Sequence, residues 1–197
     1  MTNLLLISTG AVIGIIVAVV LVILLLALLI WYISCYNALK TLVNKVEEAW
    51  ATIDVSLKKR YDLIPNLVAT VKGYAKHESE TLEKVIAARN LAMTSTGDAK
   101  MAAENALTGT LKSLFALSES YPDLKANSNF TDLQRQLQSI ESELASARRY
   151  YNGVVKTFNT KIDLFPSNIV AKGMRLTKRK YFELDSEEER RNVKVEF

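Results

Sequence analysis

The sequence has little of the residues that build disulfide-stabilised or metal-binding folds. It contains one cysteine, one histidine and three prolines among 197 residues. One cysteine excludes an internal disulfide and a cysteine-rich metal site. The single histidine, His77, excludes the His-Glu-x-x-His zinc pattern and the two Glu-x-x-His pairs of a di-iron bundle. We therefore predict no metal and no cofactor.

Patterns that mark common catalytic sites are also missing. The sequence has no Gly-x-Ser-x-Gly elbow and no glycine-rich phosphate loop. A nucleophile needs an adjacent base, but Cys35 and His77 are far apart along the chain. Carboxylates two residues apart, such as Glu141 and Glu143, point to different faces of a helix, and we interpret them as solvated charge. We predict neither an enzyme nor a small-molecule substrate.

Charge is absent from the N-terminal segment. Residues 2–39 contain no Asp, Glu, Lys, Arg or His, so all 25 basic and 21 acidic residues lie further along. A membrane-spanning helix needs roughly 20 apolar residues. We predict residues 1–35 to be a membrane anchor, with the transmembrane helix at about 4–33. A cleaved signal peptide would need a basic start and a shorter apolar stretch.

Two features near the end of this anchor bear on orientation and processing. No basic residue precedes it, whereas Lys40 and Lys45 follow, which favours an outside N-terminus and a cytoplasmic bundle. Cys35 leaves a second possibility, a lipid-modified cysteine after cleavage. Tyr32 stands where lipoproteins usually carry a leucine-like residue, and the basic start is absent. The sequence therefore favours a single-pass membrane protein.

Beyond the anchor, apolar residues recur at steps of three and four, the period of an amphipathic helix. Four helices are predicted, at about residues 39–64, 66–93, 103–121 and 133–165. The prolines Pro65, Pro122 and Pro166 fall between them, where they end or kink a helix. We predict an all-α fold: the transmembrane helix, then an antiparallel four-helix bundle of up-and-down type over residues 36–168. Whether the first bundle helix continues the anchor stays open.

Residues 169–197 are predicted to form a basic, then mixed-charge, C-terminal tail. In an up-and-down bundle the chain after Pro166 returns toward the anchor, and a basic residue near an anionic leaflet contributes about 1 kcal/mol. We predict contact with the membrane surface; a soluble tail is the alternative. Elsewhere acidic and basic residues are intermixed, so no nucleic-acid partner is predicted. The predicted contact residues are Lys172, Arg175, Lys178, Arg179 and Lys180.

Asparagines follow aromatic residues on the predicted fourth helix. Asn152 comes after Tyr151, and Asn159 comes after Phe158. An asparagine near a bundle seam can fix the register of the helices at some cost in stability. An ordinary surface position is the alternative for each.

Several long motifs closely resemble the LemA family of bacterial membrane proteins. They are KKRYDLIPNLV at 58–68, VKGYAKHE at 71–78, YPDLKAN at 121–127, ARRYYN at 147–152 and FPSN at 165–168. The resemblance covers about residues 36–182. The residues that carry it most clearly are Asp62, Pro65, Asn66, Gly73, His77, Glu78, Pro122, Arg148, Tyr151, Asn152, Asn159 and Pro166.

The resemblance implies a helical bundle behind an N-terminal anchor in the bacterial cell membrane, and it implies no known catalytic activity. Some family members occur alongside membrane metalloproteases, and a relative resembles proteins that help build magnetosome membranes. We expect a scaffold that self-associates or binds partners at the bilayer, and so organises or remodels membrane. Its partners would be lipid, further copies of the chain and another membrane protein. The alternative is an adaptor or regulator of a membrane protease or other membrane complex.

Overall fold

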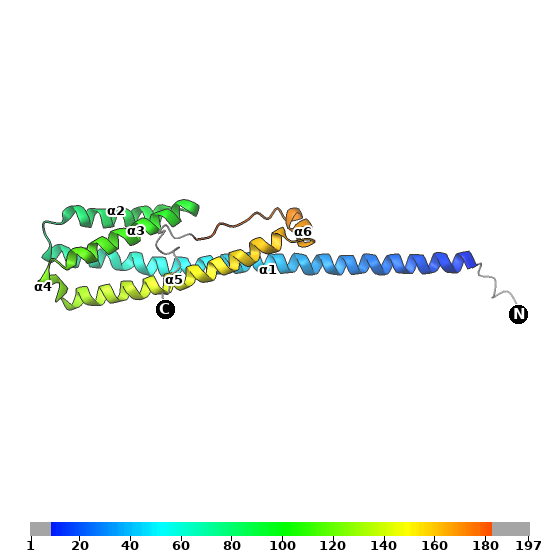
Figure 1. Cartoon of the computed structure of the whole chain (residues 1–197), viewed down its shortest axis with the longest axis horizontal. Coiled ribbons are helices and arrows are strands. Elements are labelled where there is room, and N and C mark those ends of the chain that lie inside the picture. The colour runs from blue at the N-terminus through cyan, green and yellow to red at the C-terminus, as the bar shows by residue number, and fades with distance from the viewer. Residues whose placement is uncertain (1–8, 183–197) are drawn as a thin grey trace, which may run out of the picture. The chain divides into compact units, whose positions relative to one another are not determined.

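The computed structural model describes residues 9–182. The start of the predicted span, at residues 4–8, and the mixed-charge residues 183–197 lie outside the described part. Within residues 9–182 the chain is helical and has no strand, which confirms the all-α prediction. The helices are α1 (Thr9–Tyr74), α2 (Ser79–Thr94), α3 (Gly97–Ser118), α4 (Pro122–Lys125), α5 (Ser128–Asp163) and α6 (Ser167–Gly173) (Figure 1).

The chain divides into two compact units. One consists of residues 1–45 and 156–179, and we call it the anchor unit. The other consists of residues 46–155 and 180–197, and we call it the bundle unit. The two long helices α1 and α5 each contribute to both units. The division therefore does not follow the order of the sequence: the anchor unit joins the N-terminal segment to residues 156–179, and the bundle unit joins the middle of the chain to the C-terminal residues.

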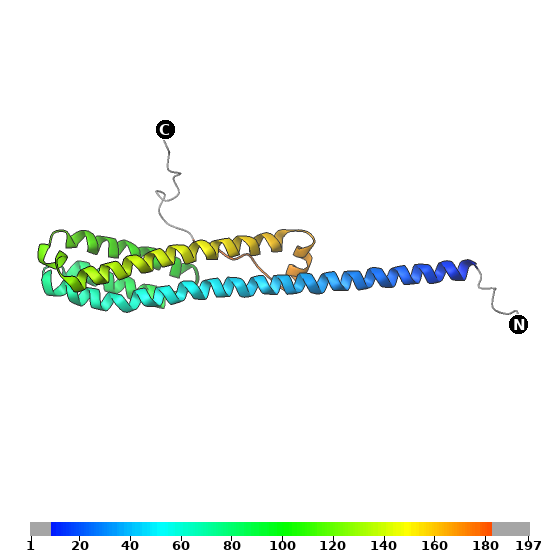
Figure 2. The same cartoon turned by 90° about the horizontal axis from the view of Figure 1, so that it is seen from below.

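The bundle unit is an antiparallel four-helix bundle. Its helices are α2, α3 and the parts of α1 and α5 within residues 46–74 and 128–155, and successive helices run in opposite directions (Figures 1 and 2). Apolar residues at steps of three and four place one face of each helix in a common core. Fully buried members of this core include Ile53, Leu57, Ile64, Leu67, Val85, Leu107, Leu114 and Leu144.

Pro65 does not lie between two helices, contrary to the sequence-based prediction. It lies inside α1, which continues to Tyr74. Proline has no N–H to bond to the carbonyl four residues earlier, here that of Tyr61. Arg89 of α2 takes that place, because its Nε donates to the Tyr61 carbonyl oxygen at 2.8 Å. A side chain from a neighbouring helix thus satisfies the backbone group that Pro65 leaves open, and the helix boundary moves to residues 75–78.

In the anchor unit, α1 begins as an apolar helix that nothing in the described chain covers. Every residue from 11 to 34 is exposed, and the first buried side chain is that of Cys35, followed by Leu39. This is the one helix in residues 9–182 that is long and apolar enough to cross a membrane. The apolar segment and the first bundle helix are one continuous helix, α1.

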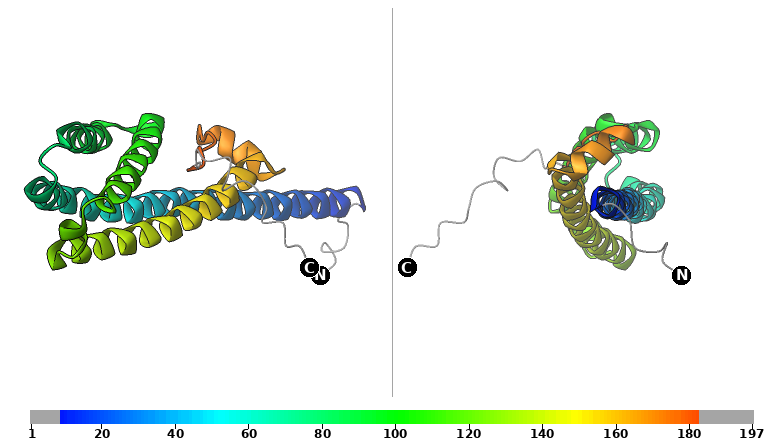
Figure 3. Two further views of the ribbon diagram at one scale, coloured as in Figure 1. Left: turned by 60° about the vertical axis from the view of Figure 1, so that its left-hand side comes forward. Right: turned by 90° about the vertical axis from the view of Figure 1, so that its right-hand side faces the viewer.

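The chain after Pro166 is more structured than a tail. Residues predicted to begin it form α6, whose Val170 and Ala171 are buried. The views in Figure 3 show α6 folded back beside the end of α5. A turn at Met174 and Arg175 follows α6, and only from Leu176 to Phe182 is the chain free of helix and turn.

Candidate functional site

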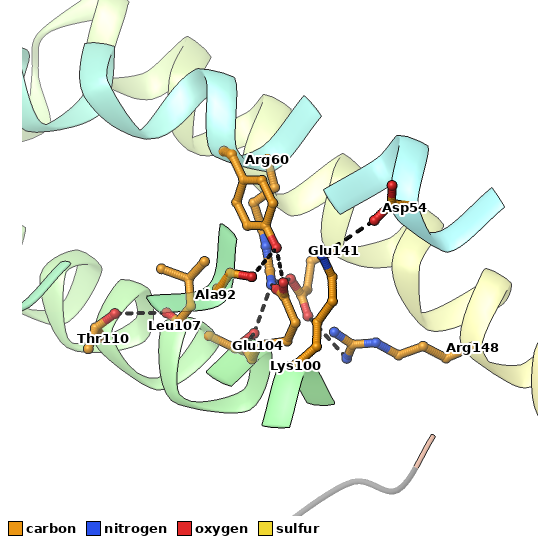
Figure 4. Close-up of polar contacts among 11 residues, drawn as sticks. Asp54, Arg60, Ala92, Lys100, Glu104, Leu107, Thr110, Glu141 and Arg148 are labelled. Carbon is orange, nitrogen blue, oxygen red and sulfur yellow. Dashed lines mark hydrogen bonds and ion pairs between the residues drawn. The ribbon is translucent and has the colours of Figure 1, made fainter. Parts of the chain in front are cut away.

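The most concentrated polar chemistry in the described chain is a buried cluster inside the bundle unit. Arg60 of α1 is fully buried and donates from Nη1 to Thr108 Oγ1 at 2.9 Å and to Glu141 Oε2 at 2.8 Å. Its Nη2 donates to Glu104, which is also fully buried. Figure 4 shows how Arg60, Glu104 and Glu141 converge from α1, α3 and α5. One guanidinium therefore ties three helices together.

Glu104 has two donors. Besides Arg60, the hydroxyl of Tyr61 donates to its other carboxylate oxygen. Burial, together with this hydrogen bond, raises the pKa of Tyr61 well above its usual value. Lys100 lies over the Tyr61 ring, with its Nζ 5.8 Å from the ring centroid, and pairs with Asp54 at 3.4 Å. The cluster thus keeps Tyr61 as a neutral hydrogen-bond donor.

Glu141 corrects one sequence-based interpretation. The spacing of Glu141 and Glu143 predicts solvated charge for both, but Glu141 accepts a hydrogen bond from buried Arg60, and Arg148 Nη1 lies 3.9 Å from its other carboxylate oxygen. Its neighbour Glu143 pairs with Lys59 at 3.2 Å, and both of those side chains are about half exposed. Only the first of the two carboxylates therefore belongs to the buried cluster.

The contacts of this cluster stabilise the packing of three helices in the bundle. Both carboxylates that contact Arg60 are held by donors, and breaking a buried pair of this kind leaves an uncompensated charge. A cavity of about 230 Å³ lies beside the cluster, below the usual range of about 300–1,000 Å³ for ligand pockets. Its lining residues include Arg60, Leu111, Phe115 and Leu137.

A larger, open groove of about 800 Å³ runs between α1 and α5 of the bundle unit. Small hydroxyl side chains line much of it, including those of Ser56, Ser142 and Ser146. Val55 and Tyr150 border it and are 59% and 53% exposed. The groove is a surface feature, and the two charged residues of its lining, Lys59 and Glu143, pair with each other at 3.2 Å.

Asn152 and Asn159 hold the extended C-terminal segment against α5. In the bundle unit, Asn152 Nδ2 donates to the Phe182 carbonyl at 3.0 Å, and its Oδ1 accepts from the Phe182 N–H at 2.7 Å. In the anchor unit, Asn159 bonds in the same way to the backbone of Arg179, with both distances 2.9 Å. We call these two pairs the amide clamps.

The role of the asparagines in the clamps differs from both roles that the sequence suggested. They neither fix the bundle register across a seam nor sit as free surface residues. A carboxamide offers one donor and one acceptor side by side, which matches the N–H and C=O of one extended residue. The two asparagines are seven residues apart, a rise of about 10.5 Å along a helix. Their partners are three residues apart, an advance of about 10 Å along an extended chain, so the two spacings match.

Aromatic contacts add to the clamp in the bundle unit. The Phe182 ring is buried, lies 6.3 Å from the Trp50 ring, and has the Arg148 guanidinium 4.6 Å from its centroid. Tyr151 packs edge-on against Trp50 at 5.5 Å, and its hydroxyl donates to the Lys180 carbonyl at 3.2 Å. Residues of the motif ARRYYN therefore bind the end of the described chain against α5.

Two other signature segments meet at the connections between helices. The Tyr121 hydroxyl donates to Glu78 at 2.9 Å, and this bond raises the pKa of Tyr121. Asn127 accepts from the Phe130 N–H at 2.9 Å, as a helix cap does, and donates to the Tyr74 hydroxyl at 2.9 Å. These bonds join the α1–α2 turn to the connection before α5.

The remaining signature residues lie on the surface. His77 is exposed in the turn between α1 and α2. The other exposed signature residues are Asp62, Pro65, Asn66, Gly73, Pro122 and Pro166. In residues 9–182 no group of three or more His, Cys, Asp or Glu side chains is placed to hold a metal ion.

The predicted basic residues are all exposed. Lys172, Arg175, Lys178 and Arg179 belong to the anchor unit, and Lys180 belongs to the bundle unit. The sequence of the anchor unit has eight Lys or Arg and a single acid, Asp163, which pairs with Lys178 at 2.7 Å. This excess is larger than the net charge of +4 of the whole chain, so the rest of the chain is net negative.

Sequence reasoning missed Arg60 and Glu104. A signal was available, since Arg60 stands three residues after Leu57 and four before Ile64, on the apolar face of its helix. Glu104 stands three residues before Leu107, again on the buried side. A charged residue at a seam position on each of two helices points to a buried ion pair.

Comparison with known proteins agrees with the motifs. The profile of the LemA family matches residues 49–197. A curated relative, Protein LemA of Metamycoplasma hominis, is 28% identical over 150 residues, which cover 74% of this chain and 67% of the relative. These matches confirm the resemblance that the motifs indicated.

Proposed function

Because the chain belongs to the LemA family, we propose that it is a non-enzymatic scaffold anchored in a bacterial cell membrane by α1. The bundle self-associates or binds partners at the bilayer surface and thereby organises membrane or membrane proteins. The observation that carries the proposal is the uncovered apolar helix of residues 11–34, which continues without a break into the bundle. A helix of that length in water would expose far more apolar surface than soluble proteins tolerate.

Charge supports the same proposal. Eight basic residues and one acid share the anchor unit with the apolar helix. Anionic headgroups attract basic residues close to a membrane surface at about 1 kcal/mol each. Lys172, Arg175, Lys178, Arg179 and Lys180 are the proposed headgroup contacts. The basic residues after the span favour a cytoplasmic bundle.

The interior of the bundle is consistent with a scaffold. The buried guanidinium of Arg60 bonds to side chains of α3 and α5, so these two helices and α1 are held together as one body. A surface presented by such a body keeps its shape when a partner binds, so less ordering entropy is lost. The open groove between α1 and α5 supplies a feature into which a photo-crosslinker can be placed.

Photo-crosslinking in native membranes tests the proposal. A benzophenone amino acid replaces Val55 at the edge of the groove, and in a control chain it replaces Leu91, an equally exposed residue of α2. Crosslinks between copies that depend on position 55 are the expected result. Products that stay monomeric at both positions, together with monomeric protein by light scattering after detergent extraction, would contradict self-association.

The alternative function is an adaptor or regulator of a membrane protease or other membrane complex. It needs one foreign partner rather than further copies of the chain. In the same experiment it predicts one recurrent membrane protein crosslinked from position 55 and no self-crosslinks. The two functions are therefore separated by the identity of the crosslinked product.

A further inference from the structure

The turn between α5 and α6 exposes an unusual group of apolar side chains. Phe165 is 80% exposed, more than any other large apolar side chain in the described chain, including those of the uncovered helix. Leu164 and Ile169 beside it are 54% and 60% exposed. We call Leu164, Phe165 and Ile169 the apolar corner. Three such residues together form a patch, whereas exposed apolar residues of a soluble surface are usually scattered.

The corner belongs to the same compact unit as the apolar helix. Residues 156–163 of α5 run toward the N-terminal end of α1, and α6 lies beside α1 (Figures 1 and 2). The turn that joins α5 to α6 is therefore the part of this pair directed toward the apolar segment of α1. Residues 11–34 rise about 36 Å, more than a hydrocarbon core of about 30 Å needs.

Residues near the end of the span mark the membrane interface. Trp31, Tyr32 and Tyr36 are exposed on α1, and such aromatic residues gather at the level of the headgroups. Cys35, in the same stretch, is the first buried side chain of the helix. The anchor unit thus begins to pack where the interface is expected.

The backbone of the corner is suited to a poorly hydrated environment. Ser167 Oγ donates to the carbonyls of Lys161 and Leu164 at 2.6 and 2.9 Å. The Asn168 N–H donates to the Leu164 carbonyl at 2.8 Å, and Pro166 has no N–H to satisfy. Carbonyls at the end of α5 are therefore bonded within the turn, which lowers the cost of placing it among lipids.

We propose that the apolar corner inserts into the interfacial layer of the same membrane that α1 crosses, as a second point of attachment. Leu164, Phe165 and Ile169 enter the boundary between headgroups and acyl chains. Lys172 and Arg175, which follow on α6 and just after it, face anionic headgroups. Removing these apolar side chains from water favours insertion, and the proposed span already holds the corner near the bilayer.

This inference rests on the proposed membrane anchoring, and one experiment separates the two. The full chain carrying Cys35→Ala receives a single new cysteine, Phe165→Cys, Val22→Cys or Leu91→Cys. Each protein is labelled with a nitroxide and reconstituted into vesicles of phosphatidylethanolamine and phosphatidylglycerol. Collision with oxygen, which concentrates in lipid, is compared with collision with a water-soluble nickel chelate. Leu91 is the matched control, an exposed apolar residue outside the corner.

The expected result is a ratio of oxygen to nickel collision at position 165 that is severalfold higher than at position 91 and lower than at position 22. A water-like ratio at 165 with a lipid-like ratio at 22 overturns the inserted corner and leaves the anchor intact. Water-like ratios at both positions overturn the anchor and the corner together. Circular dichroism of each labelled chain verifies that the helices are retained.

Discussion

Arg60 is the largest fully buried side chain in the described part of the chain, and its charge is compensated by side chains rather than by water. Removing one partner of such a group leaves the other charged in a medium that solvates it poorly. The residues around Arg60 are therefore unequal in importance: those that are buried should dominate stability, and those at the surface should contribute little.

Replacing Glu104 tests this inequality. We expect Glu104→Leu to lower the free energy of unfolding by about 3 kcal/mol or more, because Arg60 keeps only Glu141 as a charged partner. The matched control is Glu143→Leu, which breaks the exposed pair with Lys59 and should cost less than about 1 kcal/mol. Chemical denaturation of the detergent-solubilised chain, followed by circular dichroism, measures both. Equal losses would contradict the structural importance of the cluster.

Tyr61 predicts a pH dependence. Its pKa is raised in the folded chain, so the unfolded chain releases the phenolic proton first as the pH rises past about 10. The folded state then holds more protons, and its stability falls with pH by up to about 1.4 kcal/mol per pH unit. Below about pH 9 the phenol is protonated in both states, so the stabilisation by the Tyr61 hydrogen bond to Glu104 is fully present. Tyr61→Phe should give a flatter stability curve above pH 10 in denaturation series; an unchanged slope would contradict the raised pKa.

At the scale of helices, the length of α1 depends on a contact with α2. Pro65 leaves the Tyr61 carbonyl without its helical partner, and Arg89 supplies a donor at 2.8 Å. The extended C-terminal segment depends in a similar way on side chains of α5. Both elements are stabilised by hydrogen bonds from another segment rather than by their own residues.

A double-mutant cycle tests the compensation at Pro65. We expect Arg89→Ala to cost about 1–2 kcal/mol, because the Tyr61 carbonyl is left without a partner. In a Pro65→Ala chain the same change should cost less, since the N–H of the new residue can donate to that carbonyl. Thermal unfolding of the four chains gives the coupling energy. A coupling near zero would show that Arg89 does not compensate for the proline.

The amide clamps predict protection from proteolysis. Asn152→Ala together with Asn159→Ala removes four hydrogen bonds, each of about 1 kcal/mol. Trypsin should then cut faster after Lys178, Arg179 and Lys180, because the peptide bonds that follow these residues lie in the released segment. Asn44→Ala, at an exposed position of α1, serves as the control. Cleavage at the same rate in all chains would contradict the clamps.

At the scale of the whole molecule, the distribution of charge differs between the two units. The anchor unit combines an uncovered apolar helix with eight basic residues, whereas the rest of the chain is net negative. We therefore expect an anionic membrane to attract the anchor unit and to repel the rest of the chain. Salt should weaken both effects, because exposed charges are screened over about 8–10 Å at moderate ionic strength.

Vesicle binding by a chain that lacks residues 1–34 tests this distribution without the span. Changing Lys172, Arg175, Lys178, Arg179 and Lys180 to Gln should lower co-sedimentation with phosphatidylglycerol vesicles at least about 100-fold at low salt, from about 1 kcal/mol per residue. A second chain carries the same number of changes among exposed basic residues of the bundle unit. Those are Lys58, Lys59, Lys84, Lys125 and Arg135. Equal losses in the two chains would contradict a specific membrane-facing surface.

The helical class, the apolar segment and the family could be predicted because they depend on composition, period and motif. A long run without charged residues indicates that a helix lies in a membrane rather than in water. Apolar residues at steps of three and four indicate which face of a helix is buried. The prediction of a helix boundary at Pro65 was wrong because the donor to the Tyr61 carbonyl, Arg89, lies on another helix. Glu141 was misjudged because its partner, Arg60, lies 81 residues away.

The sequence by itself determined that this chain is all-α, that an uncharged segment of membrane-spanning length precedes its bundle, and that it belongs with LemA proteins. Local patterns suffice for these properties, since solvation and helix period act over a few neighbouring residues. The tertiary structure alone decided that α1 runs past Pro65 and that Arg60 is shared by two carboxylates. It also decided that Asn152 and Asn159 grip the C-terminal segment, and that an apolar corner stands in the same unit as the apolar helix. Those features join residues distant in sequence, and their partners are known only once the helices are packed.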